Sequence, residues 1–124
     1  MDLRTLTEEL EAVSRLYADR HGIDRDDTWF LLKLHEEIGE LTQAFLMRAG
    51  QARTKGLSAE ELDARFRSEL ADVLSQVLLM ARHHGVDLED EVERKWLVWN
   101  PDRRGGSVEV EAGGVPVAGE VLDR

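Results

Sequence analysis

Apolar residues recur at intervals of three and four positions along several stretches of the chain. This spacing is typical of amphipathic α-helices, and it predicts helices over residues 3–20, 28–48 and 59–84. A fourth helix is predicted from Asp87 or Asp90 to Asn100, because the residue before Pro101 resists the helical conformation. The expected apolar faces consist of Leu3, Leu6, Leu10, Val13 and Tyr17; Leu34, Ile38, Leu41 and Phe45; Leu62, Phe66, Leu70, Val73, Val77 and Met80; and Leu88, Val92, Trp96 and Trp99.

Capping signals support the predicted helix ends. Gly22 suits the left-handed position after a helix, and Asp27 or Thr28 is expected to cap the second helix through its side chain. Ser58 and Glu61 have the spacing of a capping box at the start of the third helix. Together these patterns predict an all-α fold, a four-helix bundle.

Residues 105–124 differ in composition from the rest of the chain. Glycine is frequent there, and the segment VEVE alternates with a period of two. This pattern favours either a flexible tail or a small β-hairpin centred on residues 112–114. We therefore expect one helical domain over residues 1–104, followed by a glycine-rich tail.

Charge and composition narrow the class of protein. The chain of 124 residues has 26 acidic and 16 basic residues, a formal net charge of −10, and no cysteine. Such an acidic surface repels nucleic acid, so a general DNA- or RNA-binding role is not expected. The lack of cysteine fits a reducing compartment, and no signal-peptide core or apolar run of roughly 20 residues is present. We therefore expect a cytoplasmic protein that does not bind membranes.

The segment LHEEIGEL, residues 34–41, crowds three glutamates into little more than one helical turn. Glu36, Glu37 and Glu40 span an arc of about 100° on the helix, and Glu37 borders the apolar face. No Lys or Arg follows any of them at position i+4, where it would form an ordinary surface ion pair. The three glutamates therefore require another kind of counterion.

Two more acidic residues lie on the next long helix. Glu69 falls on the edge of the apolar face, and Asp72 follows three residues later. An unpaired carboxylate at such an edge carries a desolvation cost of several kcal/mol. Five carboxylates from two adjacent helices suit Mg²⁺, with Mn²⁺ as a substitute, because both ions prefer oxygen ligands.

Other metal chemistry is not expected from the same residues. Zinc prefers Cys and His ligands, and these two helices lack the Glu-x-x-His pairs of a di-iron bundle. His35, His83 and His84 have no ligand partner at a useful spacing in the sequence. We therefore expect the three histidines to be structural.

The segments KLHEEIGELTQAFL and SELADVLSQVLLMA resemble the two motif helices of the MazG-type, all-α nucleoside triphosphate pyrophosphohydrolases. The signature of that family, E-E-x-x-E followed by E-x-x-D, falls on Glu36, Glu37, Glu40, Glu69 and Asp72. The resemblance covers residues 28–100 and does not extend to the glycine-rich tail.

The resemblance implies a helical bundle that is completed by dimerisation, as a homodimer or a homotetramer. It implies Mg²⁺-dependent hydrolysis of a (deoxy)nucleoside triphosphate to the monophosphate and pyrophosphate, which would remove non-standard or surplus nucleotides. The five carboxylates would hold the metal ions, which neutralise the triphosphate and activate a water molecule. Glu36 or Glu37 would orient or deprotonate that water.

Five further residues are candidates for substrate contacts. By the same resemblance, Lys95, Asn100 and Arg103 would hold phosphates, although Asn100 follows Lys95 one residue later than in the family pattern. The alternative is a helix end whose bases complement the dipole. Lys33 would contact a phosphate or form an ordinary ion pair one turn along the helix. Trp29 would stack on a base or pack in the core.

Two other functions are left open by the sequence. Phosphoribosyl-ATP pyrophosphohydrolase shares the fold and the style of motif, and a helical dimeric regulator without catalysis could retain a metal site. The presence of all five acids favours an enzyme, because loss of catalysis usually leaves gaps in such a motif.

Overall fold

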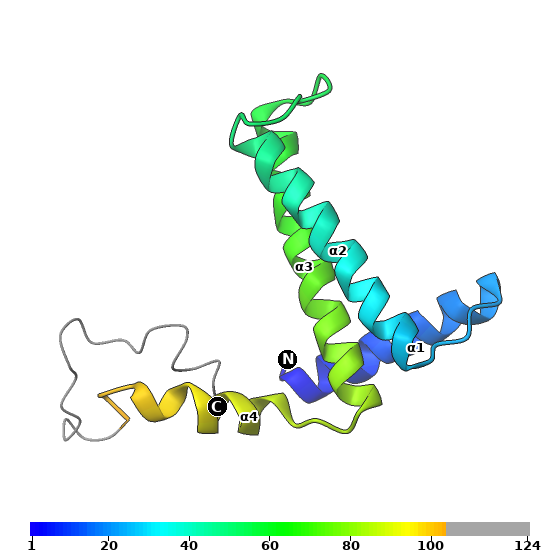
Figure 1. Ribbon diagram of the computed structural model, residues 1–124, viewed down its shortest axis with the longest axis vertical. Helices are drawn as coiled ribbons and strands as arrows, with labels where there is room; N and C mark the ends of the chain where they lie inside the picture. The colour runs from blue at the N-terminus through cyan, green and yellow to red at the C-terminus, as the bar shows by residue number, and fades with distance from the viewer. Residues whose placement is uncertain (104–124) are drawn as a thin grey trace. The chain divides into compact units, whose positions relative to one another are not determined.

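The computed structural model describes residues 1–103, and the regular elements in that range are all helical. They are α1 (Leu3–His21), α2 (Asp27–Arg48), α3 (Ala59–His83), α4 (Leu88–Lys95) and the 3-10 helix η1 (Leu97–Trp99) (Figure 1). The all-α prediction is therefore confirmed for the described part of the chain. None of these helices has the length and apolar content to cross a membrane. The tail predicted over residues 105–124 lies outside the described residues.

The chain divides into two compact units. The first, Met1–Gly85, contains α1, α2 and α3, and the second begins at Val86 and contains α4 and η1. Three of the four predicted helices, with all five predicted metal-binding acids, thus belong to one unit.

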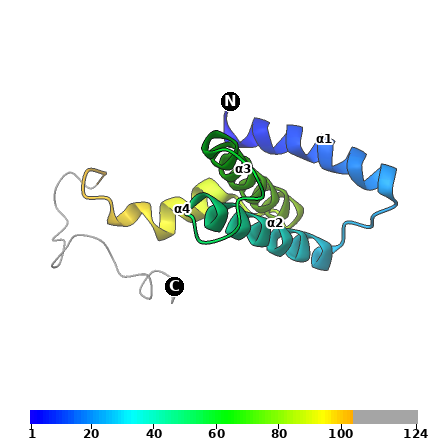
Figure 2. The ribbon, with the colours of Figure 1, turned by 90° about the horizontal axis from the view of Figure 1, so that it is seen from above.

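The helices α2 and α3 form an antiparallel hairpin and lie side by side, as Figures 1 and 2 both show. The connection of residues 49–58 closes one end, where Arg48 Nε lies 2.9 Å from Asp63 Oδ1. At the other end, Asp27 Oδ1 and His83 Nε2 are 2.7 Å apart. Because these contacts lie at opposite ends of the hairpin, residues near the middle of α2 face residues near the middle of α3.

Side chains cap the starts of the four α-helices. Each cap accepts a hydrogen bond from the backbone N–H three residues later; the caps are Asp2, Asp26, Ser58 and Asp87. The predicted capping box of α3 is confirmed, and so is the left-handed Gly22 after α1 (φ 62°). The predicted cap of α2 at Asp27 or Thr28 is wrong. Asp26 has the extended backbone of a cap, so its carboxylate reaches the N–H of Trp29 at 2.7 Å.

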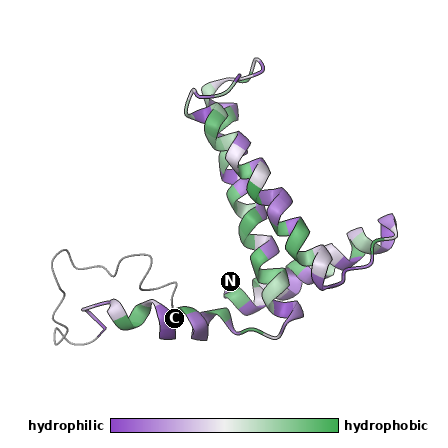
Figure 3. Ribbon diagram, in the orientation of Figure 1, coloured by the Kyte–Doolittle hydropathy of each residue, from purple (hydrophilic) through white to green (hydrophobic). Residues whose placement is uncertain are grey.

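The buried face of α2 differs from the predicted one. Its buried residues are Phe30, Glu37, Ala44 and Met47. Ile38 and Phe45, which were expected in the core, are 42% and 49% exposed. Apolar residues occur on more than one side of α2, so periodicity alone selects the wrong face; Figure 3 shows apolar and polar residues interspersed along both long helices. As a result, Glu37 lies within the buried row rather than at its border.

The fourth predicted helix ends earlier than expected. The helix α4 stops at Lys95, and the chain continues as the 3-10 helix η1. There the N–H of Trp99 bonds the carbonyl of Trp96, and the N–H of Asn100 bonds that of Leu97, both at 3.1 Å. The approach of Pro101 explains this tighter turn, because a residue before proline leaves the α-helical conformation.

A network of charged side chains joins α1 to the rest of the first unit. Glu11 is 5% exposed, and it accepts two hydrogen bonds from Arg25, at 2.9 and 2.7 Å, and one from Arg15 at 2.6 Å. Arg82, near the end of α3, lies 3.5 Å from the same carboxylate and donates to Glu8. The hydrogen bonds from Arg25 are the main reason that the pKa of Glu11 falls to about 2. Buried acid and surrounding bases therefore hold α1 against α3.

Acid is expected to weaken this attachment. Because the folded pKa of Glu11 lies below its ordinary value of 4.5, its ionised form stabilises the fold above that pH, and the stabilisation is lost as pH falls toward 2. Glu11→Gln should lower the free energy of unfolding at neutral pH by about 3 kcal/mol, measured by urea denaturation. It should also flatten the acid-dependent loss. The exposed Glu9 on the same helix gives the control, Glu9→Gln, and equal losses in both variants would contradict this role.

Candidate metal centre

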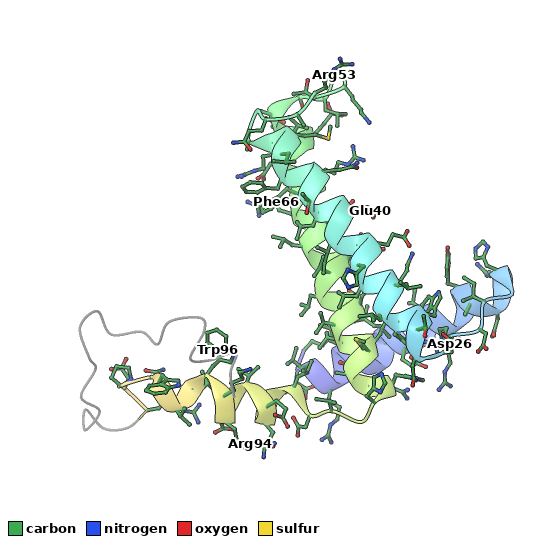
Figure 4. The ribbon with its side chains drawn as sticks, viewed as in Figure 1. Asp26, Glu40, Arg53, Phe66, Arg94 and Trp96 are labelled. Atoms are coloured by element: carbon green, nitrogen blue, oxygen red, sulfur yellow. The ribbon has the colours of Figure 1, made fainter. Side chains whose placement is uncertain are left out.

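Four of the five predicted carboxylates converge near the middle of the α2–α3 hairpin. Glu37 and Glu40 of α2 and Glu69 and Asp72 of α3 each offer an oxygen within 4.8 Å of the others. Figure 4 shows Glu40 partway along α2, well beyond Asp26 at the helix start. These four residues are referred to below as the carboxylate cluster.

The spacing of the acids explains how they meet. Residues three apart lie on the same side of a helix, one turn above the other. Each helix therefore presents a pair of acids, and the antiparallel arrangement brings the pairs together. Across the seam, Glu37 is repelled by Asp72, and Glu69 is repelled by Glu40.

Two members of the carboxylate cluster have a buried oxygen without a hydrogen-bond partner. Glu37 is 7% exposed, and the Oε2 atoms of Glu37 and Glu69 are both buried and unpaired among the described residues. A buried charged oxygen without a donor destabilises the fold by several kcal/mol. A cation placed against these oxygens would offset that cost.

Burial, and then the charge of neighbouring acids, raises the pKa of both of these acids. Burial is the largest cause for Glu37, whose pKa rises from 4.5 to about 7. The hydrogen bond with Glu40 and the charges of Glu40 and Asp72 add to this rise, while Lys33 opposes it. Burial is also the main cause that raises the pKa of Glu69, followed by the charge of Glu40. Glu37 and Glu69 therefore hold protons more tightly than isolated carboxylates do, and a bound cation would displace those protons.

The donor set of the cluster fits Mg²⁺ or Mn²⁺. All four side chains offer carboxylate oxygens, and neither Cys nor His is among them. Hard divalent cations prefer such ligands and complete their coordination with water or phosphate oxygens. The two unpaired buried oxygens would gain a partner from such a cation, because they have none within the described residues.

Glu36 lies outside the carboxylate cluster. Its side chain is 55% exposed, and one oxygen lies 3.4 Å from Lys33 Nζ. The same Nζ lies 3.6 Å from Glu37 Oε1, so Lys33 connects Glu36 with the edge of the cluster. A single-residue step turns a helix by about 100°, which explains why Glu36 faces solvent while its neighbour Glu37 is buried.

Trp29 packs beside the core at the start of α2. Its ring meets the buried ring of Phe30 edge to face, with centroids 5.0 Å apart. This contact agrees with the packing alternative for Trp29.

The other predicted substrate residues belong to the second unit. Lys95 is the last residue of α4. The side-chain oxygen of Asn100 accepts from the N–H of Asp102 at 3.0 Å, and Arg103 donates to Glu93. Two of these three side chains therefore have local partners that stabilise the turn after η1.

Two features of the first unit were not predicted from the sequence. Gln76 lies one turn after Asp72, and its Oε1 is buried without a partner among the described residues. The signal was available, because Gln76 shares the side of α3 that carries the acids. The second feature is the meeting of Asp27 with His83 and His84. It depends on the hairpin, so no local spacing could reveal it.

Comparison with known protein families, curated proteins and solved structures finds no match to this chain.

Removal of divalent cations should make the fold sensitive to alkaline pH. Protonated Glu37 is compatible with its buried site. Its contribution to the stability of the fold is therefore complete below the ordinary pKa of 4.5 and is lost as pH rises through about 7. In EDTA, the melting temperature should fall over this range, and Glu37→Gln should reduce the fall. Added Mg²⁺ should restore the wild-type protein at alkaline pH.

Glu36→Gln provides the matched control, because it makes the same chemical change one residue away on the exposed side of α2. Its melting temperature should follow the wild-type pH dependence. Superimposable profiles for wild type and Glu37→Gln in EDTA would show that the buried acid does not carry this effect.

Proposed function

We propose that this protein is a divalent-cation-dependent nucleoside triphosphate pyrophosphohydrolase. It would convert a (deoxy)nucleoside triphosphate to the monophosphate and pyrophosphate, with Mg²⁺ as its cation and Mn²⁺ as a substitute. The observation that supports this most directly is the carboxylate cluster, with two buried oxygens that lack a partner among the described residues. The resemblance of the two motif helices to MazG-type enzymes supplies the reaction class.

The proposed roles of the acids follow from which of their oxygens converge. Glu37, Glu40, Glu69 and Asp72 would hold the cation, because their oxygens converge. When bound, the cation neutralises phosphate oxygens and lowers the pKa of a water molecule. The carboxylates contact the triphosphate only through that cation, because without it the negative carboxylates and the negative phosphates repel each other.

Glu36 and Lys33 are proposed to act beside the cluster. Glu36 lies outside the group of four, and its exposed carboxylate, which pairs with Lys33, can also orient the attacking water or accept its proton. Lys33 Nζ lies between Glu36 and Glu37 and can turn a donor toward a phosphate oxygen. Of the two general bases that the motif allows, the geometry favours Glu36, because Glu37 is committed to the cluster.

A product assay tests the reaction. The full chain would be incubated with common and modified nucleoside triphosphates and with phosphoribosyl-ATP, in Mg²⁺ or Mn²⁺, and the products separated. We expect metal-dependent release of monophosphate and pyrophosphate. Glu69→Gln should reduce the rate by at least a hundredfold, because it removes a cluster ligand with an unpaired oxygen.

Glu9→Gln is the matched control for that assay, since it makes the same substitution on an exposed part of α1. It should retain the wild-type rate. Turnover of phosphoribosyl-ATP alone would reassign the substrate within the same chemistry. No turnover on any of these compounds by a protein that binds Mg²⁺ would instead favour a non-catalytic helical regulator.

We also propose that the chain acts as a homodimer or homotetramer. Large apolar side chains are between 42% and 67% exposed on all three helices of the first unit, including Val13, Leu16, Leu32, Ile38, Phe45, Leu70 and Leu74. Exposed apolar groups in such number are unusual on a soluble monomer. A second copy of the chain would cover them, as the resemblance to MazG-type enzymes implies.

Light scattering after size exclusion measures this association. The wild-type protein should elute with at least twice the mass of one chain. Leu74→Glu should shift it toward the monomer, because a charge in an apolar interface opposes association. Ser68→Glu, an exposed polar position on the same helix, should leave the mass unchanged. A wild-type mass equal to that of one chain would refute the proposal.

A further inference from the structure

Asp27, His83 and His84 meet where α2 begins and α3 ends. One ligand atom of each lies within 4.8 Å of the other two. His83 Nε2 is 2.7 Å from Asp27 Oδ1, and the rings of His83 and His84 meet edge to face with centroids 5.0 Å apart. This group, the histidine cluster, is formed by the open end of the α2–α3 hairpin.

The surrounding structure orders the His83 ring, while the side chain of Asp27 is 78% exposed. The His83 ring packs on the ring of Phe30 with centroids 4.4 Å apart, and Phe30 is 2% exposed. Asp27 is the first residue of α2, and His84 caps the end of α3 with its N–H bonded to the carbonyl of Met80 at 3.1 Å. The His83 ring is already ordered, so it loses little conformational freedom when a ligand binds.

Charge at this end of the hairpin is compatible with a cation. Arg25 also contacts Phe30, with its guanidinium carbon 5.5 Å from the ring centroid, but the buried Glu11 neutralises it through two hydrogen bonds. The end of α3 carries the negative pole of its helix dipole and the start of α2 the positive pole of its own, so the two dipoles offset each other here. Asp27 adds a full negative charge.

The chemistry of the histidine cluster differs from that of the carboxylate cluster. Two imidazole nitrogens and one carboxylate oxygen suit zinc and similar transition metals, and three protein ligands leave a fourth tetrahedral position for water. Ligands around tetrahedral zinc lie about 3.4 Å from one another, given their bond lengths. The distances here range from 2.7 Å up to at most 4.8 Å, so small rotations of exposed side chains would suffice.

We propose that Asp27, His83 and His84 form a site for Zn²⁺ or a similar transition-metal ion. Zn²⁺ would take the place of the proton between His83 and Asp27, and that proton would pass to solvent. The ion would join the first residue of α2 to the last residue of α3, next to Arg82, which contacts α1. It would thus stabilise the end of the hairpin where α2 begins and α3 ends.

This site is independent of the proposed hydrolase activity. Ten residues separate Asp27 from Glu37, which corresponds to about 15 Å along the axis of α2. The two groups of ligands share no residue. Each can therefore be removed while the other is left intact.

Calorimetric titration of the full chain with ZnCl₂ tests the site, with excess Mg²⁺ present to occupy the carboxylate cluster. We expect one Zn²⁺ per chain at this site. His84→Asn and Asp27→Asn should each weaken that binding at least tenfold. His35→Asn, at an exposed position on α2, and Glu69→Gln should keep the wild-type affinity.

The melting temperature gives a second readout and confirms that each variant folds. Zn²⁺ should raise it for wild type and for His35→Asn, and much less for His84→Asn. Wild-type zinc affinity in folded His84→Asn and Asp27→Asn would overturn the proposal. So would absence of zinc binding, or loss of zinc binding in Glu69→Gln, because the ion would then belong to the carboxylate cluster.

Discussion

The repulsion among four carboxylates at the seam of α2 and α3 is the constraint on which the first unit depends. Apolar packing on both sides of the seam opposes it. On α2, buried Phe30 and Ala44 lie before and after Glu37, and on α3 the buried Leu62 and Leu78 flank the other two acids. The hairpin therefore presses together groups that would separate if they were free to do so. This repulsion lowers the stability of the hairpin when no cation is bound. A divalent cation would relieve it.

Two buried glutamates of this chain show the contrast. Glu11 is surrounded by arginines, and hydrogen bonds from Arg25 lower its pKa to about 2. Glu37 is buried to a similar degree, but no arginine among the described residues meets it, so burial and then the neighbouring acids raise its pKa to about 7. The same chain thus satisfies one buried acid with its own bases and leaves the other short of positive charge. Lys33, at 3.6 Å from one oxygen, does not remove that deficit.

The sequence predicted the helices well because their signals are local. Periodicity and caps such as Ser58 depend on neighbouring residues, and the acids three apart in α2 and α3 could be assigned to one side of each helix. The buried face of α2 could not be predicted, because Ile38 and Phe45 are as apolar as the residues that α3 covers. Glu36 is exposed because it lies away from this buried face. The meeting of Asp27 with His83, 56 residues away, required the antiparallel hairpin itself.

Titration with Mn²⁺ tests most directly whether the carboxylate cluster is a cation site. Binding is monitored by the loss of the electron paramagnetic resonance signal of the free ion. Wild type and Glu36→Gln should bind Mn²⁺ with equal affinity, because Glu36 lies outside the group of four acids. Glu69→Gln should bind it at least tenfold more weakly. Equal affinity in wild type and Glu69→Gln would contradict the account, and the crowded carboxylates would then need another explanation.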